Sequence, residues 1–174
     1  MDAKVEHTQS SGAITDEDVS TIQDTWKPVY EKKEDAGVAV LIRFFMNNPS
    51  AKQYFTHFGD MQGPDEMREN AQLKKHALRI MNALNMLVTN LRDVDKVNNI
   101  FTQMGKTHAL KHKVDPVYFE KIAAVILEVL VEAFPQFFSA AAVQGVWSKL
   151  MGILCTELNK VYTEVGWESI KNSA

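Results

Sequence analysis

Two of the five histidines, His76 and His108, fall on apolar stripes of helical spacing, where a side chain could bind a ligand inside the protein. His76 follows Leu73 by three residues and precedes Ile80 by four, so the three share one helix face. His108 comes next in a second apolar series, formed by Val97, Phe101 and Met104. A buried imidazole without a partner costs ~1–3 kcal/mol. The pair therefore predicts either two core histidines with hydrogen-bond partners or two ligands that face one another across a cavity.

A metal between these histidines would bind one nitrogen of each, but a metal held by protein alone needs more ligands. Zinc takes three or four protein ligands, and no third histidine, cysteine or acidic residue stands at an obvious spacing. His108 and His112 form an H-x3-H pair, yet Ala109 stands where a metalloprotease motif has Glu. A haem suits the pattern better, because the porphyrin supplies four of the six iron ligands. With Cys155 as the single cysteine there is no C-x-x-C-H attachment motif, so a haem would bind non-covalently.

The other three histidines are expected nearer the surface. His7 lies in a polar N-terminal stretch and His57 in a polar connection, so we expect both to be solvated. His112 stands near the end of its helix, because the Asp115-Pro116 pair must interrupt that helix. It either contacts a haem propionate or complements the helix dipole as a cation, and the residues favour neither reading.

The elements that must position these side chains are all helical. The chain has 8 Gly and 5 Pro, and apolar residues recur at spacings of three and four along almost its whole length. Thr15, followed by Asp18, predicts a helix start, and the first helix is expected to end near residue 32. Further helices are expected up to Pro49, over the Leu73–Leu91 and Val97–His108 stripes, and after Pro116 and Pro135. The result is an all-α domain of about seven or eight helices.

Composition limits the classes of protein. A chain of 174 residues with 45% hydrophobic residues fits one domain. The formal net charge is −3, and scattered Lys and Arg mark neither nucleic-acid binding nor a polybasic membrane patch. No apolar run approaches the ~20 residues of a membrane span, and the start lacks the apolar core of a secretory signal. We therefore expect the protein to stay inside the cell, without stable membrane insertion.

Several longer motifs together resemble the vertebrate globins, and most closely the cytoglobin family. They are RFFMNNPSAKQYFTHF, QLKKHALRIMNAL, GKTHALKHKVDPVYF, VILEVLVEAF and VYTEVGW. The resemblance covers residues 16–167 and implies a globin domain there, built as a globin fold of seven to eight helices around non-covalently bound haem b. Cytoglobins have extensions at both ends, which here correspond to a flexible N-terminal arm at residues 1–15 and a short C-terminal tail at residues 168–174.

The resemblance also implies roles for individual residues. His108 matches the proximal iron ligand and His76 the distal histidine, and both are expected to bind the resting iron, with His76 as the catalytic residue. Phe55 matches the phenylalanine stacked on the haem, with Phe58 behind it. The other haem-contacting positions are matched by Leu41, Ile80, Met104, Val114, Phe119, Ile122 and Leu154. Arg79 and His112 match residues that pair with the haem propionates. Tyr162 matches the tyrosine that ties the last helix to the turn after the proximal ligand.

The expected activity follows from the same resemblance. The protein is expected to bind O2, NO, CO and nitrite at the haem, and to act as a nitric oxide dioxygenase that depends on an external reductase. Nitrite reduction and peroxidase-like reactions are also associated with such globins. Three rivals are a simple oxygen carrier with five-coordinate ferrous iron, a haem-based sensor, for which no output segment is visible in the sequence, and a helical module without cofactor. Monomer or homodimer, and a cytoplasmic or additionally nuclear location, stay open.

One departure from the cytoglobin pattern concerns thiol chemistry. Cytoglobins commonly carry two cysteines that can form an internal disulfide, and the matching positions here are Lys33 and Leu78. That disulfide cannot form in this chain. Cys155 stands at a different place, where we expect a small buried hydrophobe rather than a redox sensor.

Overall fold

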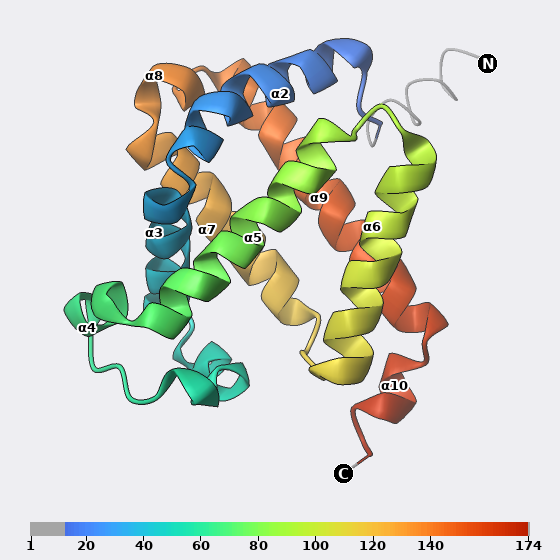
Figure 1. The fold of residues 1–174 in the computed structure, drawn as a ribbon. Helices are drawn as coiled ribbons and strands as arrows, with labels where there is room; N and C mark the ends of the chain where they lie inside the picture. The colour runs from blue at the N-terminus through green and yellow to red at the C-terminus, as the bar shows by residue number, and fades with distance from the viewer. Residues whose placement is uncertain (1–12, 174) are drawn as a thin grey trace.

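The computed structural model describes residues 13–173, and every regular element among them is helical. The longer helices pack around one hydrophobic core (Figure 1). Their bounds are α2 Asp16–Glu31, α3 Lys33–Asn47, α5 Ala71–Thr89, α6 Val94–Lys106, α7 Val117–Ala133 and α9 Ala141–Glu164. The short turns are η1 Pro49–Tyr54, η2 Thr56–Phe58, α4 Pro64–Glu69, η3 Thr107–Lys111, α8 Pro135–Phe138 and α10 Trp167–Ile170. The prediction of an all-α domain is confirmed.

The first helix begins where the sequence predicts. The Thr15 hydroxyl accepts a hydrogen bond from the Asp18 amide at 3.0 Å, and the Asp18 carboxylate accepts one from the Thr15 amide at 3.1 Å. This reciprocal pair satisfies two amides that the first turn leaves without helical partners. Of the predicted arm, residues 1–12, and His7 with them, lie outside the described residues.

The helices that bear the two histidines each approach a neighbour closely at a glycine. In α3, Gly37 lies so near α5 that an added Cβ would come 2.8 Å from the Ala77 carbonyl oxygen. In α6, Gly105 lies so near α9 that a Cβ would come 2.7 Å from the Cβ of Val161. Any side chain larger than hydrogen at these two positions would push α3 away from α5, or α6 away from α9.

The structure differs from the sequence prediction at three places. The polar connection expected around His57 contains η2 and leads into α4. The stripe on α5 is interrupted, because the helix ends at Thr89, before Leu91, and Ile80 is only half-buried. The segment predicted as a tail includes most of α10, whose Trp167 is buried against the core. None of the helices described is long and apolar enough to cross a membrane.

Candidate functional site

Helix α5 holds His76 against two phenylalanines. The α5 N-terminus is fixed by Asn70, whose side chain accepts from the Leu73 amide at 2.9 Å and donates to the Phe58 carbonyl at 2.8 Å. The same side chain therefore ties α5 to η2. The His76 ring meets Phe55 edge-on at 4.9 Å between centroids and Phe58 at 6.1 Å. The structure thus places the His76 imidazole beside the two phenylalanines that the resemblance assigns to the haem site.

The surroundings of His76 keep its ring neutral. Burial, and to a lesser extent nearby positive charge from Arg79, His108, His57 and His112, together lower the pKa of His76 to about 4. No carboxylate is among the groups that influence this pKa. A neutral imidazole has one N–H and one nitrogen with a free lone pair. At neutral pH His76 can therefore serve as a metal ligand or as a hydrogen-bond donor.

His108 lies in a widened helical turn. After α6 the chain continues as the π-helical turn η3, in which the His112 amide donates to the Thr107 carbonyl at 3.1 Å. His108 Nδ1 lies 2.7 Å from the Met104 carbonyl oxygen. A carbonyl only accepts, so Nδ1 carries the proton and the lone pair is on Nε2. Such a backbone contact is typical of a histidine that binds a metal through its other nitrogen.

The turn that follows His108 is held from two sides by tyrosines. The Tyr162 hydroxyl on α9 donates to the Val114 carbonyl at 2.7 Å, as the resemblance implies for this tyrosine. From the other side, the Asp115 amide donates to the Tyr54 hydroxyl of η1 at 3.1 Å. Tyr54 directly precedes Phe55 in the chain, so this bond links the segment next to His76 with the segment next to His108.

The remaining predicted site residues divide by burial. Phe119 is buried and meets the His108 ring at 5.2 Å between centroids. Two leucines, Leu41 on α3 and Leu154 on α9, belong to the same buried core. Arg79 and His112 are exposed, and the His112 ring centroid lies 6.0 Å from that of His108. The apolar positions that are only half-buried are Phe55, Ile80, Met104, Val114 and Ile122.

These residues fit a haem better than a metal held by protein alone. Across residues 13–173, no group of three or more His, Cys, Asp or Glu side chains is placed to hold an ion. Two imidazoles suffice when a porphyrin provides the other four nitrogens. The half-buried apolar residues would line its faces, and the exposed Arg79 guanidinium and His112 imidazole could donate hydrogen bonds to its carboxylates.

Sequence reasoning missed two features of the site. His57 is exposed, as expected, but its ring meets Phe58 at 4.7 Å between centroids and its charge reaches His76. Its position between Phe55 and Phe58 in the chain was the available signal. The π-helical turn has no signal in the residue pattern, because the spacing of Met104 and His108 suits an ordinary α-helix equally well.

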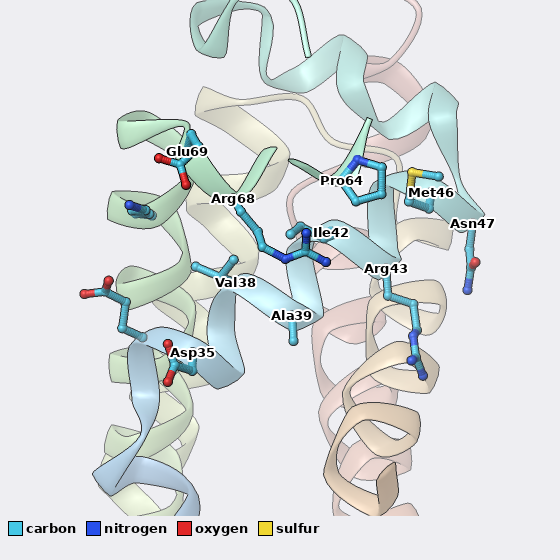
Figure 2. Close-up of a pocket in the computed structure, with 12 residues that line it drawn as sticks. Asp35, Val38, Ala39, Ile42, Arg43, Met46, Asn47, Pro64, Arg68 and Glu69 are labelled. Carbon is cyan, nitrogen blue, oxygen red and sulfur yellow. The ribbon is translucent and has the colours of Figure 1, made fainter. Parts of the chain in front are cut away.

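A surface groove of about 690 Å³ lies elsewhere, between α3, α4 and the start of α5 (Figure 2). None of the predicted site residues lines it. Charged side chains of both signs, including Asp35, Arg43 and Arg68, surround its apolar residues (Figure 2). Arg43 donates to both carboxylate oxygens of Glu132, at 2.6 and 2.8 Å, and is thereby engaged within the fold. The groove is separate from the histidine site.

Comparison with known proteins shows the family of the chain. The family model described as Globin matches residues 38–158, a span that contains both histidines. The chain is 66% identical over 170 residues to "Cytoglobin-1" of Danio rerio, with 98% of each chain covered. It is 52% identical over 161 residues to "Cytoglobin-2" of Oryzias latipes, with 92% of this chain and 89% of the relative covered. "Globin-1" of Petromyzon marinus is 32% identical over 150 residues, which cover 86% of this chain and 93% of that one.

Proposed function

Because the chain belongs to the globin family and is of the cytoglobin type, with haem b as its cofactor, we propose that it acts as a nitric oxide dioxygenase. In this proposal His76 and His108 both bind the resting iron, and a gas must displace His76 before it reacts. The observation that carries the proposal is the pairing of a neutral, half-buried His76 with a His108 whose Nε2 is free.

The bound haem supplies an iron at which gases bind and at which dioxygen oxidises nitric oxide to nitrate. The residues of the chain hold and protect that group. Met104 fixes the His108 ring through Nδ1, so that Nε2 has a defined direction. Tyr162 and Tyr54 keep the following turn in place. His76 can present its lone pair in the resting protein or, once displaced, donate its N–H to a bound gas.

Apolar side chains restrict water on the His76 side. Phe55 and Phe58 pack against one edge of the His76 ring, and their own centroids are 5.0 Å apart. Leu41 is fully buried in the hydrophobic core that also contains Phe58. A dry environment also favours the neutral imidazole, because burial penalises the charged form.

The need to displace His76 lowers the apparent affinity for gases. If the open form is populated at ~1%, the apparent affinity falls ~100-fold below that of the open site. Oxidation of nitric oxide to nitrate with dioxygen would also draw one electron from the haem in each turnover. An external one-electron reductase is therefore part of the proposal.

The variant His76→Leu tests the proposal. It removes the proposed sixth ligand of the iron and puts an apolar side chain of similar length in its place. In flash photolysis of the carbon monoxide complex, we expect faster, single-phase rebinding, because no internal ligand competes. His57→Leu is the matched control, since it removes an exposed imidazole from the neighbouring turn.

Two results of this test would contradict the proposal. Unchanged rebinding kinetics in His76→Leu would exclude His76 as a competing ligand and favour a simple oxygen carrier. Mixing the oxygen-loaded protein with nitric oxide should yield one nitrate for each nitric oxide consumed. Loss of nitric oxide without nitrate would exclude the dioxygenase reaction.

A further inference from the structure

Positive charge is concentrated on the two helices that carry the histidines. The chain contains 22 Asp and Glu against 19 Lys and Arg, for a formal net charge of −3. Yet no carboxylate occurs between residues 70 and 92, which include α5, or between residues 96 and 114, which include most of α6 and all of η3. The acidic side chains are displaced to other elements. The surface near the histidine site therefore differs in sign from the protein as a whole.

The end of α6 and the turn after it form a small exposed basic surface, which we call the proximal patch. It consists of Lys106, Leu110, Lys111, His112 and Lys113, all of them exposed. Leu110, at the centre of this run of residues, is 49% exposed. None of the three lysines pairs with a carboxylate that the structure describes. The patch thus offers unneutralised positive charge around an apolar side chain.

Lys113 occupies a strained backbone position. Its φ is +52°, and among residues 13–173 it is the single non-glycine residue with positive φ. Glycine or asparagine would adopt this conformation more easily. Strain of this kind persists at sites where the side chain has a task. The exposed Lys113 side chain forms no ion pair with a carboxylate that the structure describes, so it is available to a molecule outside the fold.

The proximal patch reaches the candidate iron ligand through one side chain. The ring centroid of the exposed His112 lies 6.0 Å from that of His108. A molecule seated on the patch would therefore be separated from His108 by little more than the His112 ring. The carboxylate nearest in the chain, Asp115, is directed to the start of α7, where it accepts from the Val117 amide at 3.0 Å.

We propose that the proximal patch is the docking surface for an acidic redox protein that delivers electrons to the haem. The inference rests on the proposed function, which requires an external reductant. Lysines around a small apolar centre suit a brief electrostatic encounter, in which charge speeds association more than it strengthens binding. Stable recruitment to anionic lipid takes clusters of about 4–8 Lys or Arg, more than this patch supplies, so a protein partner is the better match.

The test uses haem-loaded protein and, as probe, a reduced plant-type ferredoxin, a small acidic iron–sulfur protein. One electron leaves the ferredoxin cluster, which is oxidised, and ferric iron in the globin is reduced to ferrous. We compare wild type with Lys111→Glu combined with Lys113→Asn, because Asn tolerates the backbone conformation at residue 113. The control is Lys27→Glu, an exposed lysine on α2, a helix that lies far from the end of α6 in Figure 1.

We expect the second-order reduction rate to fall at least ~10-fold in the patch variant at low salt, and to change little in the control. The rate in wild type should fall as salt rises, and that dependence should weaken in the variant. A second readout is carbodiimide coupling, which joins a ferredoxin carboxylate to a lysine amine. Mass spectrometry should find the cross-link at Lys106, Lys111 or Lys113.

Three results would overturn the proposal. The first is an equal loss of rate in the patch variant and in Lys27→Glu. The second is cross-links that map away from the patch. The third is charge-dependent binding of the patch to phosphatidylserine vesicles with unchanged ferredoxin reduction, which would assign the patch to a lipid surface. Nitrate formation with dithionite-reduced protein is measured in parallel, so failure of the dioxygenase reaction is distinguished from failure of docking.

Discussion

Replacing Gly37 with alanine tests how the fold places His76. The new Cβ would lie 2.8 Å from the Ala77 carbonyl oxygen and 2.9 Å from Met81 Cγ. The Met81 side chain can rotate, but the Ala77 carbonyl belongs to the α5 backbone, one residue from His76. To reach the 3.4 Å of ordinary contact, α3 and α5 must separate by about 0.6 Å.

The size of the effect follows from two opposing contributions. Alanine is favoured over glycine inside a helix by ~1 kcal/mol, whereas overpacking of a core costs ~1–3 kcal/mol. Because a backbone atom obstructs Gly37→Ala, the upper half of that range applies. We expect a net loss of about 1–2 kcal/mol in the free energy of unfolding. The displaced α5 should also move His76 and enlarge the fraction of open, five-coordinate iron.

The matched control is Gly152→Ala on α9, where an added Cβ meets nothing within 4 Å. This change should stabilise the protein by up to ~1 kcal/mol. Urea unfolding of both variants, with and without haem at fixed concentration, measures the difference. Equal stabilities for the two variants would refute the close approach of α3 and α5. A destabilised Gly37→Ala with an unchanged visible spectrum would refute the link to His76.

Three further predictions concern other contacts. Tyr162→Phe should lower the free energy of unfolding by about 1–2 kcal/mol in urea titrations, because the Val114 carbonyl loses its donor. An unchanged urea midpoint would contradict a stabilising hydrogen bond from Tyr162 to Val114. The Lys149 ammonium holds the pKa of Asp18 below its ordinary value, so this stabilisation is complete above about pH 4 and is lost as pH falls through the folded-state pKa. Asp18→Asn should therefore destabilise at pH 7 but little at pH 2, and equal losses would argue against the pair. Lys113→Asn should match or exceed wild-type stability by up to ~1 kcal/mol, since it relieves strain at φ +52°; clear destabilisation would contradict the assigned backbone conformation.

Most of the long helices could be predicted from the helical spacing of apolar residues in the sequence. The stripe that begins at Leu73 and the series that ends at His108 correspond to α5 and to α6 with its π-helical turn, because burial on one side selects apolar residues every three or four positions. The capping pair Thr15 and Asp18 marked a helix start for an equally local reason. Short elements such as α4 were missed, since one or two turns are too short to display a period.

The geometry of the site depended on contacts that spacing does not encode. The close approach at Gly37 requires knowing which helix lies against it, and glycine has many other uses in a chain. The hydrogen bond from Asp115 to Tyr54 joins residues 61 positions apart. Lys113 has a positive φ in the turn between η3 and α7. Lysine does not favour that conformation, so the sequence does not predict it.

The central claim is that His76 and His108 are both ligands of the resting iron. It is tested most directly by the visible absorption spectrum of the purified protein, oxidised and then reduced with dithionite in the absence of oxygen. Two imidazole ligands predict sharp, paired bands in the reduced form, and His76→Leu should abolish the pairing. A single broad band in the reduced wild-type protein would place an open sixth position on the iron and contradict the account.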